Sequence, residues 1–195
     1  MHRTLPLVVA LGLAACNQYG YVPTTNTSAT VRGRPAADYQ MPPENPTGDV
    51  QLATLGIAKL PAVMGATVDA LHLSMVVTNN GKLPWFVDRG EQRVQLAGQT
   101  TPIYASPDAA TPPRVSIEGG DSQTIDLFFR LPATEEKARE LPAFDATWVV
   151  HTPERTVQER TTFDRFTVEP AHYDDWSGRG GPSWESPWGY PPGTD

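Results

Sequence analysis

The only cysteine of this chain, Cys16, has a thiol that could form a covalent bond. It ends a short apolar run that begins at Leu5 and has the basic residue Arg3 ahead of it. A basic start, an apolar stretch and small residues before a cut are typical of a secretory signal peptide. The run is about nine residues long, whereas a membrane-spanning helix needs roughly 20. A free reactive thiol or half of an intermolecular disulfide are the other roles open to Cys16.

The segment Leu13-Ala14-Ala15-Cys16 resembles the lipobox of bacterial lipoproteins. The resemblance implies that residues 1–15 are a lipoprotein signal peptide and that Cys16 is the lipid attachment site. Its thiol would carry a diacylglycerol and its freed amine a further acyl chain such as palmitate, and two or more chains give stable attachment. Asn17 follows, where an aspartate would signal retention at the inner membrane. The resemblance therefore implies the periplasmic face of the outer membrane.

Metal chemistry finds little support in the sequence. The histidines His72, His151 and His172 lie on separate segments, and no spacing places two of them on one helix face. A zinc site needs three or four converging ligands, so His72 and His151 could contribute only if their strands were neighbours. Asp174-Asp175 lacks the alternate acidic positions of a calcium loop. We predict no metal site and no cofactor.

Catalytic motifs are equally sparse. No serine has the glycine-flanked turn of hydrolase nucleophiles. Asp126, Asp145 and Glu159 are expected on outward strand faces, whereas glycoside hydrolysis needs two carboxylates in one cleft. Gly119-Gly120 has no following lysine, so it is not a phosphate-binding loop. The sequence predicts no catalytic residue and a protein that is not an enzyme.

Charge narrows the choice of partners. The 195 residues carry 15 basic and 22 acidic side chains, a formal net charge of −7. Nucleic-acid binding requires a basic patch, so no nucleic-acid partner is expected. The same acidity argues against binding to anionic lipids through a cluster of basic residues, so the acyl chains would have to provide the membrane attachment alone.

Proline and glycine divide the chain into three parts. Residues 16–49 have five prolines, a small polar run and no apolar period, and we expect them to be a lipidated cysteine followed by a flexible tether. A coil of about 33 residues would span roughly 30 Å, at about 5–6 Å times the square root of its length. Residues 50–169 are the expected folded domain, and residues 170–195 a disordered tail rich in glycine, proline and tryptophan.

Short alternating segments in residues 50–169 predict β-strands. In the clearest, Val68–Thr78, the four residues Leu71, Leu73, Met75 and Val77 are expected to point inward. Trp148 is expected in the core of the strand 144–150, whose partner 157–168 should carry a bulge near Thr161-Thr162. Residues 133–141 form the one helix-like patch. The other expected strands are 50–57, 85–87, 93–96, 103–104, 115–117 and 125–131. Strands this short, with turn signals at this spacing, indicate an all-β, antiparallel, immunoglobulin-like β-sandwich.

A second resemblance rests on turn chemistry over about 100 residues. A strand ends in Val77-Thr78-Asn79, a Gly-Gly-Asp-Ser turn follows at 119–122, and an apolar strand closes in Pro132. This order is similar to the immunoglobulin-like, telokin-like domains of unknown function on bacterial lipoproteins. The family pattern has proline-glycine-glutamate-serine at the turn, where this chain has Glu118-Gly119-Gly120-Asp121-Ser122. The resemblance implies a fold and no catalytic residues.

Two functions remain from different classes. The first is a non-enzymatic, membrane-anchored lipoprotein whose sandwich serves protein–protein or envelope-polymer interaction. The second is an envelope enzyme whose site is built from loops and leaves no local motif. Large amphipathic aromatics anchor interfaces more often than other residues. Partner contacts with an envelope protein or polysaccharide are accordingly expected from the tail residues Trp176, Trp184, Trp188 and Tyr190.

Overall fold

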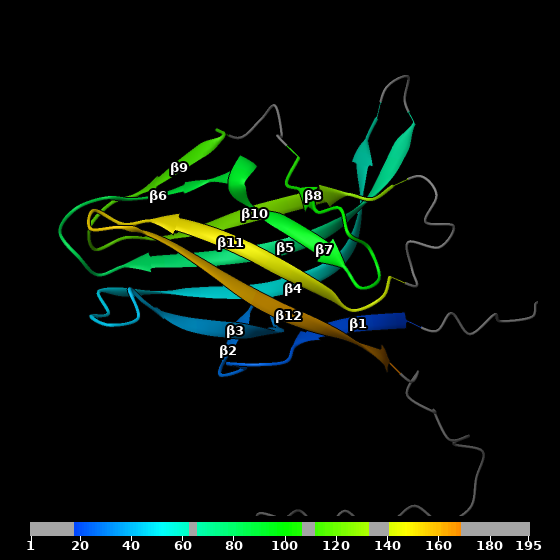
Figure 1. Cartoon of the computed structure of the whole chain (residues 1–195), viewed down its shortest axis with the longest axis horizontal. Coiled ribbons are helices and arrows are strands. Elements are labelled where there is room, and N and C mark those ends of the chain that lie inside the picture. The colour runs from blue at the N-terminus through cyan, green and yellow to red at the C-terminus, as the bar shows by residue number, and fades with distance from the viewer. Residues whose placement is uncertain (1–17, 63–65, 107–111, 133–140, 169–195) are drawn as a thin grey trace, which may run out of the picture.

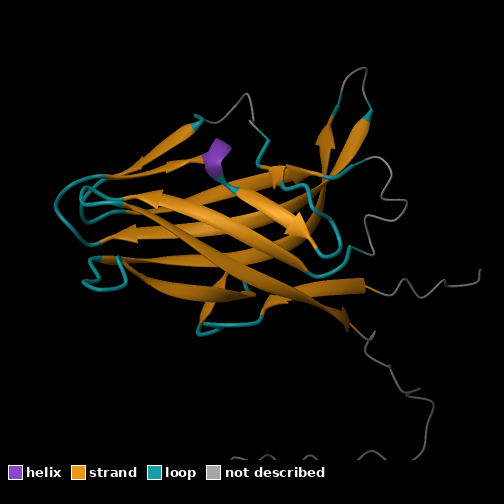
Figure 2. Cartoon of the chain, viewed as in Figure 1, coloured by secondary structure: helices purple, strands orange, loops and turns teal. Residues whose placement is uncertain are grey.

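Two antiparallel β-sheets pack face to face in this computed structural model, which describes residues 18–62, 66–106, 112–132 and 141–168 (Figures 1 and 2). One sheet runs β1-β12-β11-β6-β9, with β7 pairing β11 and β8 pairing β7, and the other runs β10-β5-β4-β3-β2. The strands of the seven-stranded sheet are β1 Gln18–Pro23, β6 Trp85–Asp88, β7 Arg93–Leu96, β8 Ile103–Tyr104, β9 Arg114–Ile117, β11 Phe144–His151 and β12 Thr156–Val168. Those of the five-stranded sheet are β2 Ala29–Val31, β3 Arg34–Met41, β4 Gly48–Pro61, β5 Thr67–Asn79 and β10 Ser122–Arg130. The predicted all-β sandwich is confirmed.

The core lies between the sheets and follows the period-2 alternation of the strands. Along β5, Leu71, Leu73, Met75 and Val77 are at most 1% exposed, as predicted. Trp148 on β11 is also 1% exposed, and its indole Nε1 donates to Thr161 Oγ1 at 3.1 Å. The largest fully buried side chains include Trp85, Trp148, Phe129, Phe144, Phe163 and Met41.

The prediction of a flexible tether over residues 16–49 is wrong from Gln18 onward. β1 pairs with β12, and β3 pairs with β4 from Ala37↔Leu52 to Met41↔Gly48. These strands bury Tyr21 and Met41, which are 6% and 0% exposed. The prolines do not prevent this because proline is tolerated at strand ends, on edge strands and in turns. The folded domain therefore begins at Gln18 and not at Val50.

A small second core explains why the outer face of the five-stranded sheet is not simply solvated. The β2–β3 hairpin places Val31 and Ala36 against Ala53 of β4 and Val76 of β5. Ser74 of β5, whose cross-strand partner is Ala53, lies on this outer face and is nevertheless 0% exposed. The outer side chains of β4 and β5 are therefore buried locally by a segment expected to be unstructured.

The bulge predicted near Thr161-Thr162 is wrong. β12 pairs with β11 without a register shift from His151↔Thr156 to Phe144↔Phe163, and its remaining length pairs with β1. The register shift lies instead in β4, between Thr54 and Gly56, where Gly56 has a φ of 90° that glycine adopts readily. Phe166 keeps the alternation of β12 and lies on the outer face, where its ring covers Gly20, its cross-strand partner on β1. The helix-like patch at 133–141 lies outside the described residues except for the buried Leu141.

Candidate functional site

The predicted lipid attachment site, the third histidine of the mature chain and the predicted partner-contact residues of the tail lie outside the described residues. These are Cys16, His172, Trp176, Trp184, Trp188 and Tyr190. The structure does describe both strands next to them: β1 begins at Gln18, two positions after Cys16, and β12 ends at Val168. Within the described residues, no helix is long and apolar enough to cross a bilayer.

The two described histidines lie on different sheets and do not meet. His72, on the outer face of β5, stacks on Phe128 with ring centroids 4.3 Å apart, and its Nε2 is 2.9 Å from Asp126 Oδ1. Arg32, from the β2–β3 turn, donates to both carboxylate oxygens of Asp126 at 2.9 and 3.0 Å. Partial burial raises the pKa of Asp126, but the hydrogen bonds from His72 and Arg32 outweigh it and leave the pKa below its ordinary value. These contacts attach the β2–β3 hairpin to strands β5 and β10.

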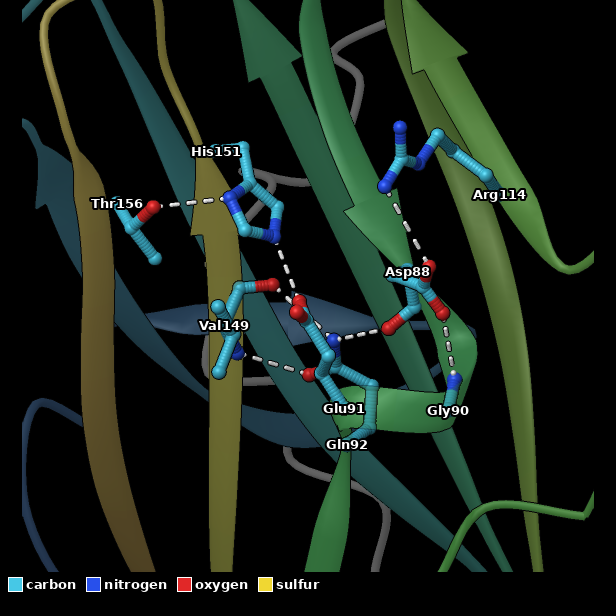
Figure 3. Close-up of polar contacts among 8 residues, drawn as sticks. All are labelled: Asp88, Gly90, Glu91, Gln92, Arg114, Val149, His151 and Thr156. Atoms are coloured by element: carbon cyan, nitrogen blue, oxygen red, sulfur yellow. Dashed lines mark hydrogen bonds and ion pairs between the residues drawn. The ribbon is translucent and has the colours of Figure 1, made fainter.

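His151 lies in a line of hydroxyl, imidazole and carboxylate groups (Figure 3). Its Nδ1 is 2.9 Å from Thr156 Oγ1 and its Nε2 is 2.6 Å from Glu91 Oε2. His151 and Thr156 are cross-strand partners, and Glu91 comes from the 3-10 turn η2, Arg89–Glu91. Hydrolases use the same three group types in the same order. Here the imidazole and carboxylate are 29% and 45% exposed, so water screens the interactions that catalysis would need.

Gln92 explains why η2 is held at this position. β11 pairs with β7 up to Thr147 and with β6 only at His151, which leaves Val149 without a strand partner on that side. The buried side-chain amide of Gln92 takes the place of the missing strand residue. Its Oε1 accepts a hydrogen bond from Val149 N at 2.9 Å, and its Nε2 donates one to Val149 O at 3.1 Å. Nε2 also donates to Asp88 O at 2.7 Å. The side chain therefore mimics a peptide group in the sheet, and Glu91 is positioned next to His151 as a consequence.

Two hollows open on the molecule, and neither is lined by His72 or His151. One, of about 430 Å³, is lined by Asn26, Asp38–Met41, Pro43 and Glu159. The other, of about 250 Å³, is lined by Pro42, Glu44, Asn45, Thr47, Glu154 and Arg155. An ion pair between Glu44 and Arg155 joins the β3–β4 turn to the β11–β12 turn beside the second hollow.

The expected outward position of Glu159 is wrong. Glu159 pairs with Trp148, and the side chains of cross-strand partners share a face, so it points to the inner side of its sheet. It is half-buried and lines the larger hollow with Asp38, where an edge of the sandwich is open. Asp126 and Asp145 lie on outer faces, and Asp145 bonds to Thr162 at 2.6 Å and to Arg160. These three carboxylates do not share one cleft.

Carboxylates on the outer face of β3 and β4 are poorly solvated. Asp38 and Asp49 each have a buried Oδ1 without a hydrogen-bond partner. Desolvation, and then the charge of Asp38, raise the pKa of Asp49 above its ordinary value. In the described part of the chain no three His, Cys, Asp or Glu side chains are grouped so that they could hold a metal ion.

Comparisons with known proteins give little further guidance. No protein-family model and no curated protein matches the chain. The X-ray structure of Northeast Structural Genomics Consortium target SoR45 aligns with 69% of this chain and 96% of its own, at 10% identity and a TM-score of 0.35. The crystal structure of a protein from Archaeoglobus fulgidus aligns with 60% of this chain and 99% of its own, at 9% identity and a TM-score of 0.35.

Proposed function

We propose that this chain is a lipid-anchored protein of the bacterial cell envelope, whose sandwich serves interaction with an envelope protein or polymer and catalyses no reaction. The observation that carries the proposal is the lipobox segment Leu13-Ala14-Ala15-Cys16 at the end of a short apolar run. Acyl chains on Cys16 would hold the domain at the membrane, since two or more give stable attachment. Asn17 favours the periplasmic face of the outer membrane.

The surface supports binding in preference to catalysis. The two hollows, of about 430 and 250 Å³, are lined mainly by carboxylates, amides and prolines, and neither His72 nor His151 lines them. The carboxylate and amide groups at these hollows would suit hydrogen bonding to the side chains of a protein or the hydroxyl groups of a polysaccharide. The aromatic residues Trp176, Trp184, Trp188 and Tyr190 would add contacts of the kind that anchor interfaces.

Replacing the cysteine tests the anchor directly. In Cys16→Ser the lipid has no thiol to attach to, so the protein should stay unprocessed or become soluble and no longer enter the detergent phase. The wild-type chain should show the added acyl mass by mass spectrometry. A serine variant that still fractionates with membranes, alongside a wild-type chain without acyl mass, would refute the proposal.

A matched control separates anchoring from sorting. Asn17→Asp keeps the cysteine and its acyl chains but places an aspartate after it. We expect this variant to carry the same acyl mass and to move to the inner-membrane fraction. If Asn17→Asp stays in the outer-membrane fraction, the proposed location is wrong while the anchor stands.

The line Glu91–His151–Thr156 is the observation that favours an envelope enzyme instead. If Thr156 acts as a nucleophile, Thr156→Val should abolish hydrolysis of a chromogenic ester, and His151→Gln should do the same. Our proposal predicts no ester hydrolysis by the wild-type chain above the uncatalysed rate. Wild-type activity that is lost in both variants would replace the proposed function with the enzymatic one.

A further inference from the structure

We propose that the end of the sandwich formed by the start of β1 and the end of β12 rests directly on the lipid surface, and that the opposite end faces the partner. This inference rests on the proposed lipid anchor and adds an orientation to it. It follows from the correction of the N-terminal segment, because the expected tether is occupied by strands β1, β2 and β3.

The chain between Cys16 and β1 is too short to lift the domain off the membrane. β1 begins at Gln18, and its first pair is Gln18↔Val168. Two residues of fully extended chain reach at most about 7 Å. The expected tether would have spanned roughly 30 Å. An acylated Cys16 would therefore hold this end of the sandwich within the headgroup layer, and β1 could leave it only by unpairing from β12.

The aromatic tail starts from the same end. Gln18 and Val168 are paired, so residue 169 continues from the end that lies next to the anchor (Figure 1). Trp176, Trp184 and Trp188 follow within 20 residues of Val168. Tryptophan is enriched at membrane–water interfaces because its ring is apolar and its N–H remains hydrated. Tryptophans that follow this end of the chain would therefore suit contact with the lipid surface.

The opposite end carries the hollow that is bridged by the Glu44–Arg155 ion pair. β12 has 13 residues, which at about 3.3 Å each places Thr156 up to roughly 40 Å from Val168. The β3–β4 and β11–β12 turns lie together there, at the left of Figure 1. With the anchor at one end of the strands, these turns would project away from the membrane, toward an envelope partner.

Two single-cysteine probes test the orientation, because Cys16 is the only natural cysteine and its thiol would be blocked by lipid. Thr101→Cys places a probe in the loop after β7, at the proposed membrane end, since Leu96 is paired with the first residue of β11. Asn80→Cys places one after β5, at the far end, where the preceding Asn79 is paired with Gly48. Both positions are neutral and exposed. Each introduced cysteine would be labelled with an environment-sensitive fluorophore. The acylated protein would then be reconstituted in phospholipid vesicles whose headgroups carry spin labels that quench the fluorescence.

We expect the fluorescence of the probe at position 101 to be quenched several times more strongly than that of the probe at position 80. When the same probes are placed on a non-acylated Cys16→Ser chain, the quenching should be weak and equal at the two positions. Trp85 and Trp148 are each 1% exposed, so any quenching of the intrinsic fluorescence would report the three tail tryptophans, and we expect it in the acylated protein. Equal quenching at Thr101 and Asn80 in protein with confirmed acyl mass would overturn the orientation and leave the anchor intact. Protein without acyl mass would instead mean that the proposed function has failed.

Discussion

At the residue scale, two buried hydroxyl groups show how the polar atoms of this core are placed. Thr161 Oγ1 lies 2.8 Å from Tyr39 OH and 3.1 Å from Trp148 Nε1, and it links the two sheets. Tyr39 and Trp148 also pack edge to face, with ring centroids 5.1 Å apart. Ser74 Oγ, on the other side of the five-stranded sheet, is buried without a partner. Burial of a polar group is tolerated where it is bonded and costs free energy where it is not.

Removing these two hydroxyls should therefore have opposite effects. Ser74→Ala should stabilise the protein by about 1 kcal/mol, because an unbonded buried hydroxyl is lost. Thr161→Val keeps the shape but leaves the Tyr39 and Trp148 donors unpaired, and should destabilise it by about 1–3 kcal/mol. Urea denaturation of both variants checks the prediction. A loss of stability in Ser74→Ala would mean that its hydroxyl has a partner in solution.

Asp49 and Asp126 predict a dependence of stability on pH. Desolvation raises the pKa of Asp49 in the folded protein. The contribution of Asp49 to the free energy of unfolding is therefore fully present below its pKa in the unfolded chain, and it is lost as the pH rises through its pKa in the folded protein. Asp49→Asn should raise the melting temperature at neutral pH and leave it almost unchanged well below pH of about 3.9, the ordinary value for aspartate.

Asp126→Asn is the matched control. Its hydrogen bonds to His72 and Arg32 hold its pKa down in spite of desolvation, so its contribution is present above the unfolded pKa and is lost as pH falls through the folded pKa. This variant should lower the melting temperature at neutral pH. Thermal melts from acid to neutral pH measure both effects, and shifts of the same sign in the two variants would contradict the assignment.

At the scale of elements, the N-terminal strands complete the sandwich. Tyr21 of β1 packs on Phe144 at 5.5 Å between ring centroids and donates to Leu141 O at 2.9 Å. Met41 of β3 is fully buried, and the β2–β3 hairpin covers Ala53 and Ser74. Without these strands, β4 and the second half of β12 would each lose a neighbour.

A fragment of residues 50–168 should therefore fail to fold, whereas residues 17–168 should fold cooperatively. Loss of β1–β3 would expose the main core along one side and the whole second core. Far-UV circular dichroism with urea titration distinguishes the two, a sheet spectrum and a sigmoidal transition being expected for the longer fragment alone. Equal transition midpoints for the two fragments would show that β1–β3 add nothing to stability.

At the scale of the whole molecule, the end of the sandwich where β1 starts and β12 ends lies opposite the hollow between the β3–β4 and β11–β12 turns. The two ends of the described chain, Gln18 and Val168, pair with each other, and Phe166 covers Gly20 two residue pairs further in. The tail beyond Val168 has many glycines and prolines and almost no β-branched residues. Such a composition cannot bury enough apolar surface to offset the entropy of ordering.

Truncation after Pro170 should accordingly shift the melting temperature by less than about 2 °C, which corresponds to under 1 kcal/mol for a domain of this size. The same truncation should weaken envelope association beyond that given by the lipid, as measured by salt and detergent extraction. A matched variant with the three tail tryptophans replaced by alanine should reproduce the loss of association. A large fall in melting temperature would mean that the tail packs on the sandwich.

The strands with a local signal could be predicted from the amino-acid sequence alone. In β5, β10 and β11, large apolar residues alternate with polar ones, and period 2 assigns both the strand and its inward face before any partner is known. The end of the apolar strand at Pro132 was a local signal as well. Trp148 could be assigned to the core from its neighbours Phe144 and Val150 alone.

Only the tertiary structure decided the rest, because it depended on pairing between distant residues. Ala36, Ala37 and Met41 give no apolar period, and they are buried because β3 finds β4 and folds its hairpin over the sheet. Glu159 points inward because its register is set by Trp148, and Gln92 is buried because β11 has a gap that only a side-chain amide fills. The end of the molecule at which β1 starts was likewise invisible in the sequence, since the pair Gln18↔Val168 joins the two ends of the folded chain.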